Sequence, residues 1–334
     1  MEALKDSLAA AANVSALLDT AYSPQQPTHS SHDPSPPSSI SFIAFADASV
    51  AAVHVPPLPQ SCTLPSHPPV PVVASLSNVN FGVQPGSRLA VVGAARAGKT
   101  SLCLALLKML PLASGDILFD GRSVRSLHAE SISTLIAYVP SSPSVLASSV
   151  ASNIAFSRDT ASQAQVERAA VAVGAHSCIR MLPDSYNTMI GPDSGVSLTR
   201  SQMMQLVLAR ALASDSSVVV VDDSLAALDH SAHAAVLSAL HALHPRTLII
   251  TSTAPSVSQM CHHTVLLVAG AVVQQGSYAQ LTSSRSAFAS YAAAVASPLH
   301  DVPVAAAAKR SSVELLGALQ QAVLSLRVDG KLSM

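Results

Sequence analysis

The sequence predicts an α/β fold with a mostly parallel β-sheet and an antiparallel β layer at the N-terminal side. A loop over residues 93–101 contains two glycines and lies between an apolar stretch of strand length and a segment with helical spacing. Four consecutive valines at residues 218–221 end in two aspartates, which is typical of a strand buried on both faces of a parallel sheet. Two or three stretches with strand character precede the loop, and they predict the antiparallel layer.

The composition is that of a folded chain with little charge. Of 334 residues, 49% are hydrophobic, which is ample for a core, whereas 11% are charged and the net charge is −1. This balance gives no general attraction to nucleic acid or anionic lipid, so we expect no nucleic-acid partner. The cysteines are scattered, without a C-x-x-C pair or a secretory signal, which favours a reducing, cytosolic compartment. No apolar run reaches the ~18 residues that span a bilayer, so we expect no transmembrane segment in this chain.

Composition also predicts the division of the chain. Residues 1–39 should form a short helix followed by a linker rich in proline and serine. The folded domain is expected over residues 40–297. Residues 298–334 should hold a linker and a C-terminal amphipathic helix, whose apolar residues recur at helical spacing between Ser311 and Arg327.

Within the domain, strands and helices follow from the spacing of apolar residues and from turn residues. The segments with strand character are residues 40–45, 50–55, 72–81, 88–92, 115–121, 135–139 and 217–223. Those with helical character are residues 99–110, 147–178 and 199–213, the last with Thr199 as its N-cap.

The glycine-containing loop has the spacing G-x-x-x-x-G-K-[ST] of a phosphate-binding loop. Gly93 and Gly98 let the backbone wrap a phosphate group, Lys99 supplies a positive charge, and the Thr100 hydroxyl is placed to hold Mg²⁺. A Gly/Ala turn that happens to carry a lysine is the plain alternative. The strand before the loop and the helix after it favour phosphate binding, because the helix N-terminus then faces the anion.

The aspartates Asp222 and Asp223 follow the valine strand at its carboxyl end, where open α/β sheets place their chemistry. A solvated acidic turn is the alternative interpretation. We favour a functional carboxylate, because it can serve the Mg²⁺ that Thr100 would hold.

From about residue 40 to residue 297 the order and spacing of motifs resemble the nucleotide-binding domain of an ATP-binding cassette (ABC) transporter, most of all exporters of the C, or multidrug-resistance-associated, subfamily. Residues 195–202 (GVSLTRSQ), followed by residues 208–212 (LARAL), resemble the signature segment of that family. Residues 222–229 (DDSLAALD) resemble its acidic strand end and D-loop, which places Asp229 in the D-loop.

This resemblance implies a P-loop NTPase with an ABC-type ATPase core and a helical signature subdomain at about residues 141–213. It implies ATP and Mg²⁺ as cofactors, with Thr100 and Asp222 as metal ligands. The implied nucleotide-binding residues are Gly93, Ala94, Ala95, Arg96, Ala97, Gly98, Lys99, Thr100, Ser101 and Asp222. The implied partners are a second such domain, joined head to tail, and the transmembrane domains of an exporter, at the cytosolic face of a membrane.

Several positions depart from the family pattern. Ser141 stands where the family has glutamine, and Thr253 stands where it has the switch histidine. Asp223, the candidate base, is one methylene shorter than the family's catalytic glutamate. The signature, normally LSGGQ, consists here of Leu198, Thr199, Arg200, Ser201 and Gln202, which would contact a nucleotide bound by the partner. No convincing aromatic residue precedes Leu76 to stack on adenine.

These departures leave three hypotheses. The chain is an ATP-binding domain of an exporter with slow or absent hydrolysis, or a regulatory or vestigial ABC domain that needs little nucleotide, or a different P-loop enzyme such as a small-molecule kinase. The retained pair of Lys99 and Thr100 favours the first over the second. The signature-like helix at residues 199–213 argues against the third.

Overall fold

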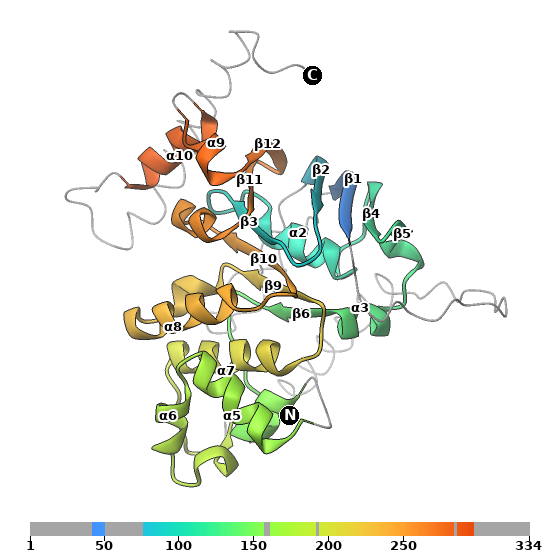
Figure 1. Ribbon diagram of the computed structural model, residues 1–334. Coiled ribbons are helices and arrows are strands. Elements are labelled where there is room, and N and C mark those ends of the chain that lie inside the picture. Colours follow the sequence, from blue (N-terminus) through green and yellow to red (C-terminus); the bar gives the residue numbers. More distant parts are fainter. Residues whose placement is uncertain (1–41, 51–75, 157–160, 192–193, 284–285, 297–334) are drawn as a thin grey trace, which may run out of the picture. The chain divides into compact units, whose positions relative to one another are not determined.

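A computed structural model describes residues 42–50, 76–156, 161–191, 194–283 and 286–296 (Figure 1). The predicted N-terminal helix and linker of residues 1–39, the strand expected beyond residue 50 and the C-terminal helix of residues 298–334 lie outside the described residues. Within the described residues, no helix combines the length and the apolar character needed to cross a lipid bilayer.

The antiparallel layer is a sheet of four strands in the order β2-β1-β4-β5. Its strands are β1 (Ile43–Val50), β2 (Leu76–Val83), β4 (Ser114–Phe119) and β5 (Arg122–Ser123). The prediction of a strand that ends at residue 45 was wrong, because β1 continues past register shifts after Phe45 to Val50, which pairs with Leu76. The rings of Phe45 and Phe81 stack across this pair, with their centroids 4.4 Å apart.

The main sheet has six strands in the order β12-β11-β3-β10-β9-β6. They are β3 (Arg88–Val92), β6 (Ile136–Val139), β9 (Val218–Asp222), β10 (Thr247–Ser252), β11 (His263–Val268) and β12 (Ala271–Gly276). Five strands are parallel, and β12 pairs antiparallel with β11. The predicted α/β class with a mostly parallel sheet is confirmed.

Both faces of the main sheet are covered, which explains the run of valines in β9. Side chains alternate between the two faces of a strand. Val218 and Val220 belong to one core, shared with α2 (Lys99–Leu106), α3 (Ala129–Leu135) and the antiparallel sheet, whereas Val219 and Val221 belong to a second core, shared with the remaining helices. All four valines have an exposed fraction of 0%.

The second core is formed mainly by helices on the other face of the sheet (Figure 1). These helices are α4 (Val150–Ala155), α5 (Gln163–Ala172), α6 (His176–Arg180), α7 (Arg200–Ala213), α8 (His230–His241), α9 (Tyr278–Leu281) and α10 (Ala287–Ala296). Short 3-10 turns occur at Val124–Ser126, Ser185–Asn187, Ser224–Ala227 and Pro255–Met260, and β7 (Ser148–Ser149) pairs with β8 (Met189–Ile190).

Two helix predictions need correction. The helix expected over residues 147–178 is divided into α4, α5 and α6, because Ser149 and Ser162 cap new helices and Gly174, at φ +73°, ends one. The helix that begins at Lys99 ends at Leu106 and not at residue 110, and Lys108 adopts a φ of +59° just beyond it. The helix with Thr199 as N-cap is confirmed as α7.

Candidate nucleotide-binding site

The two motif glycines occupy places that a side chain cannot share. A Cβ added to Gly93 would lie 2.3 Å from the carbonyl oxygen of Leu267 in the neighbouring strand β11. Gly98 has a φ of +104°, and its Cβ would lie 2.8 Å from Leu76 Cδ2. The loop therefore passes from β3 to α2 against backbone and core, as a cradle for a phosphate requires.

Lys99 directs its charge back into the loop. Its side chain is 6% exposed, and its ammonium group donates hydrogen bonds to the carbonyl oxygens of Gly93, at 2.7 Å, and Ala94, at 3.0 Å. Burial lowers the pKa of Lys99, while the negative charges of Asp223 and Asp222 oppose that shift. The ammonium group is thus held where the motif predicts a phosphate.

Asp222 is fully buried at the carboxyl end of β9 and accepts hydrogen bonds from hydroxyl groups on three other elements. Its Oδ1 accepts from Thr100 at 3.2 Å and from Thr251 at 2.7 Å, and its Oδ2 accepts from the Tyr138 hydroxyl at 3.1 Å. The structure therefore brings together the two residues predicted to hold Mg²⁺. A carboxylate and a hydroxyl at this separation are oxygen donors of the kind that Mg²⁺ accepts, so the residues present fit the ion.

Asp223 and Thr253 also meet. Asp223 adopts the left-handed region with φ +46°, and its Oδ1 accepts a hydrogen bond from the Thr253 backbone N–H at 3.3 Å. The Thr253 carbonyl oxygen in turn accepts from the buried Tyr291 hydroxyl at 2.6 Å. Hydrogen bonds of its backbone thus fix the position of Thr253, whose side chain carries a hydroxyl group.

The signature segment contacts the Ser141 and Asp229 positions of its own chain. Arg200 donates a hydrogen bond from its guanidinium group to the Ser141 carbonyl oxygen at 3.3 Å. Ser201 Oγ donates to Asp229 Oδ2 at 3.0 Å and accepts from the Asp229 backbone N–H at 3.1 Å. The start of α7 is therefore tied to the loop after β6 and to the residue before α8.

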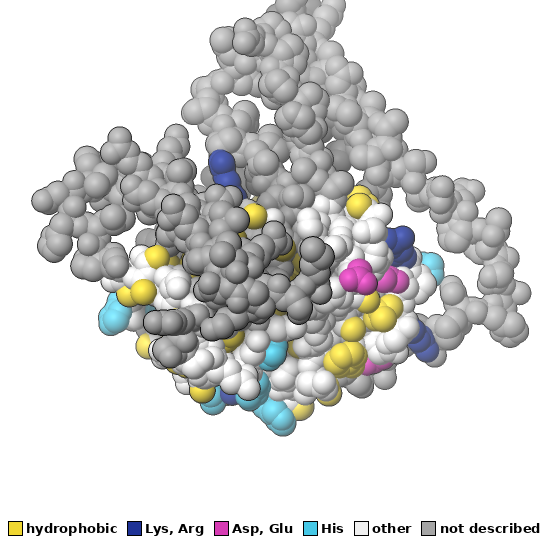
Figure 2. All heavy atoms as spheres, turned by 90° about the horizontal axis from the view of Figure 1, so that it is seen from above, with side chains coloured by type: hydrophobic (Ala, Val, Ile, Leu, Met, Phe, Trp, Pro, Cys, Tyr) yellow, Lys and Arg dark blue, Asp and Glu magenta, His cyan; other side chains and the backbone are white. Residues whose placement is uncertain are grey.

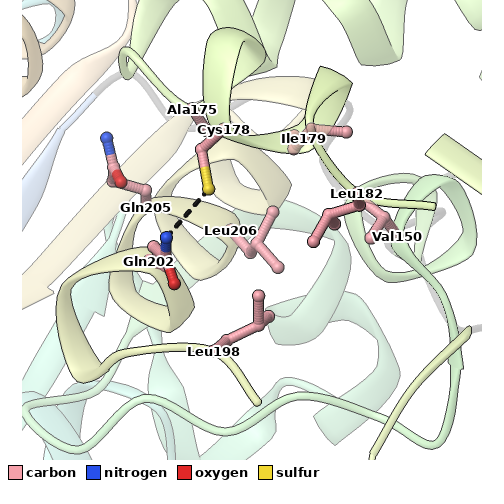
Figure 3. A pocket seen from close by; sticks show the side chains of 9 residues that line it. All are labelled: Val150, Ala175, Cys178, Ile179, Leu182, Leu198, Gln202, Gln205 and Leu206. Atoms are coloured by element: carbon pink, nitrogen blue, oxygen red, sulfur yellow. Dashed lines mark hydrogen bonds between the residues drawn. The ribbon is translucent and has the colours of Figure 1, made fainter. Parts of the chain in front are cut away.

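The other signature residues cap and pack α7. Thr199 and Gln202 form a capping box, in which Thr199 Oγ1 accepts from the Gln202 N–H at 3.2 Å and Gln202 Oε1 accepts from the Thr199 N–H at 2.8 Å. Figure 3 shows a small apolar pocket between α4, α6 and α7, into which Leu198 and Leu206 point. Gln202 also donates to Cys178 Sγ at 2.9 Å at the edge of this pocket.

Two of the three hydroxyl groups around Asp222, those of Thr251 and Tyr138, were not predicted from the sequence. For Thr251, one feature of the sequence could have indicated a role, because a polar residue follows the apolar residues 248–250 of a buried strand. For Tyr138, no feature of the sequence indicated a role, because aromatic residues are common in strands.

Comparison with known proteins places this geometry in a family. Residues 76–226 match the protein family described as ABC transporter. The chain is 32% identical to ABC transporter B family member 14 of Arabidopsis thaliana over 224 residues, which are 67% of this chain and 18% of that protein. It is also 32% identical to the ATP-dependent lipid A-core flippase of Legionella pneumophila (strain Paris) over 207 residues, which are 62% of this chain and 35% of the flippase.

The matched segment is an ABC transporter ATP-binding domain. Its fold is that of an ABC ATPase: a solved bacterial Atm1-family ABC exporter with ATP bound superimposes with a TM-score of 0.67 at 24% identity, covering 78% of this chain and 43% of the exporter. The chain spans about a fifth to a third of the length of the two curated relatives named above. These relatives carry B family and flippase names, so the expected resemblance to the C subfamily of ABC exporters is not supported.

Proposed function

We propose that this ABC domain binds Mg-ATP and couples its binding to transport through partner membrane domains, with slow or absent hydrolysis. The observation that carries the proposal is the convergence of Lys99, Thr100 and Asp222 at the loop after β3. A positive charge, a hydroxyl and a buried carboxylate meet beside a backbone cradle, and this set of groups suits a magnesium-bound triphosphate.

Different residues of the loop would contact the phosphates and the metal ion. Lys99 neutralises phosphate charge, and the loop N–H groups at the start of α2 donate to phosphate oxygens. Thr100 and Asp222 would hold Mg²⁺, which when bound neutralises charge between the phosphates. Residues 94–97 and Ser101 complete the proposed loop around the nucleotide.

Slow hydrolysis follows from the state of Asp223 and Thr253. The Asp223 carboxylate is one methylene shorter than the glutamate of the family, and its Oδ1 already accepts the Thr253 N–H. A base withdrawn by roughly 1 Å costs on the order of 10²-fold in rate. Thr253 also lacks the imidazole that would contact the terminal phosphate.

The proposed partners are a second ABC domain, joined head to tail, and the membrane domains of an exporter. Arg200 and Ser201 add side chains where a partner's nucleotide would need close backbone approach, so this chain should also weaken the site that it caps. An open groove of about 570 Å³ includes part of the signature segment and is lined by both apolar residues, such as Val145 and Met203, and polar ones, such as Ser144; we propose it as a surface for a membrane partner. The proposed location is therefore the cytosolic face of a membrane.

The low surface charge favours partners that are recognised by local shape and contacts over partners that are attracted by net charge. On the face in Figure 2, the visible Lys and Arg side chains are few and lie apart from one another. With 18 basic and 19 acidic residues in the whole chain, we propose no nucleic-acid partner.

The test is equilibrium binding of Mg-ATP to the full chain, with Lys99→Ala as the decisive variant. We expect saturable binding that weakens at least tenfold in Lys99→Ala, because the phosphate charge loses its buried partner. Lys108→Ala is the matched control, since Lys108 donates to the carbonyl oxygens of Arg125 and Leu127 away from the loop. Binding that Lys99→Ala leaves unchanged would contradict the proposal and favour a regulatory domain without a nucleotide requirement.

A further inference from the structure

We propose that Thr251 is a positioning residue that joins Asp222 to Asp223 and fixes the Asp222 carboxylate for Mg²⁺. This inference rests on the proposed binding of Mg-ATP. Neither the motifs nor the family resemblance assigns a role to Thr251.

Thr251 occupies the central place in the sheet. Strand β10 lies between β3, which leads into the phosphate loop, and β9, which ends in the aspartates. In register, Thr251 pairs with Val91 on one side and with Asp222 on the other. Its side chain is fully buried, and a buried hydroxyl is costly unless it has hydrogen-bond partners.

The hydroxyl of Thr251 has a hydrogen-bond partner both as an acceptor and as a donor. It accepts a hydrogen bond from the Asp223 backbone N–H at 3.1 Å and donates to Asp222 Oδ1 at 2.7 Å. The Thr251 carbonyl oxygen also accepts from the Asp223 N–H at 3.0 Å. One residue therefore fixes the backbone of Asp223 in its left-handed conformation and the carboxylate of Asp222 at the same time.

Among the three hydroxyl groups at Asp222, Thr251 makes the shortest bond. Thr100 donates to the same carboxylate oxygen, at 3.2 Å, but its hydroxyl oxygen is also a proposed Mg²⁺ ligand. Thr251 has no such second task, and its bond can persist in the metal-bound and metal-free states. It is thus suited to hold the carboxylate ready before the ion arrives.

The experiment compares Thr251→Val with Thr251→Ser in the full chain. Valine keeps the branched shape and removes the hydroxyl, whereas serine keeps the hydroxyl. The dissociation constant for ATP is measured in excess Mg²⁺ and in EDTA, and the ratio of the two constants is the readout. In the unmodified chain, Mg²⁺ should tighten ATP binding, and we expect Thr251→Val to reduce this tightening by about tenfold, since a hydrogen bond to a charged group is removed. The dissociation constant measured in EDTA should change little. Thr251→Ser should retain the tightening.

Thr247→Val is the matched control, because it makes the same change at the other end of β10, where Thr247 accepts a hydrogen bond from the Gly86 N–H at 3.0 Å. It should leave the ratio unchanged. If Thr251→Val does not fold, Thr251→Ala is measured in its place. An unchanged ratio in the hydroxyl-free variant, or equal losses with and without Mg²⁺, would overturn the positioning role alone. Absence of ATP binding by the unmodified chain would overturn the proposed function and this inference together.

Discussion

Asp222 and Asp223 are adjacent and chemically identical, yet their surroundings separate them. Asp222 is fully buried among hydroxyl donors, whereas Asp223 is half-buried and turns its carboxylate toward the Thr253 N–H. The change of backbone conformation at Asp223, with φ +46°, directs the two side chains differently. A metal ligand and a candidate base can therefore follow one another in the chain without competing for the same partners.

A second effect at the residue scale is pH dependence through His262. Its Nδ1 accepts the Arg88 backbone N–H at 3.0 Å, and a protonated ring could not accept this bond. Partial desolvation lowers the pKa of His262, and the charges of Arg88, His241 and His244 lower it further.

Because the folded state resists protonation, the unfolded state binds more protons as the pH falls below about 6.5. The free energy of unfolding should therefore decrease between pH 7.5 and pH 5.5, as urea denaturation would measure. The variant His262→Asn keeps a hydrogen-bond acceptor but does not titrate. Its free energy of unfolding should therefore decrease less between pH 7.5 and pH 5.5 than that of the unmodified chain. Equal losses in the two proteins would show that His262 does not contribute.

Local residue patterns were predictable from the sequence, and distant contacts were not. Thr199 was predicted as the N-cap of α7 from the residues beside it, and the structure adds its capping box with Gln202. Thr251 and Tyr138 lie 29 and 84 residues from Asp222 in sequence, and only the pairing of β6, β9 and β10 brings them to it. Single-residue roles that depend on sheet order were therefore beyond sequence reasoning.

At the scale of elements, the strands β3, β6 and β9 of the main sheet were predicted from the sequence, whereas β10, β11 and β12 were not. Strands β3 and β9 are buried on both faces, so continuous apolar runs mark them. The Ala-rich segment of residues 147–178 favours helix throughout, and its division depends on small polar caps and on Gly174. Composition showed that helices would form there but gave no signal strong enough to separate them.

The contact between α7 and α8 gives a prediction at this scale. Ser201 in the first turn of α7 exchanges two hydrogen bonds with Asp229, the N-cap of α8, and is 8% exposed. Ser201→Ala should lower the free energy of unfolding by about 1–2 kcal/mol, because a charge-assisted bond is lost and a backbone N–H loses its acceptor. Urea denaturation of the full chain measures the change.

Ser197→Ala is the control for this variant, because Ser197 is exposed in the loop before α7. It should change the free energy of unfolding by less than about 0.5 kcal/mol. Equal stabilities of Ser201→Ala and the unmodified chain would mean that the Ser201 and Asp229 contact does not stabilise the junction of these helices.

At the scale of the whole molecule, the positions that we expected to depart from the family pattern form two connected groups. Asp223 and Thr253 meet beside the candidate nucleotide-binding loop, whereas Arg200 and Ser201 contact the chain's own Ser141 and Asp229. If two such domains close head to tail, as we propose, the first group affects the nucleotide that this chain binds and the second affects the nucleotide of its partner. One chain would then reduce turnover at both sites of the pair.

We predict that turnover can be recovered without remodelling the fold. The triple variant Asp223→Glu, Thr253→His and Ser141→Gln is paired with an ABC domain that carries the full set of motifs, and ATP hydrolysis is measured. Ser141 and Thr253 make their observed contacts through backbone atoms, so replacing their side chains leaves those contacts available. We expect turnover to rise by on the order of 10²-fold, the cost of a base misplaced by roughly 1 Å.

The same variant with Lys99→Ala should lose the gain, since the gain requires nucleotide at this chain's own loop. If the triple variant gives no rise although it binds Mg-ATP, the limiting defect lies elsewhere, and the side chains of Arg200 and Ser201 become the next positions to restore.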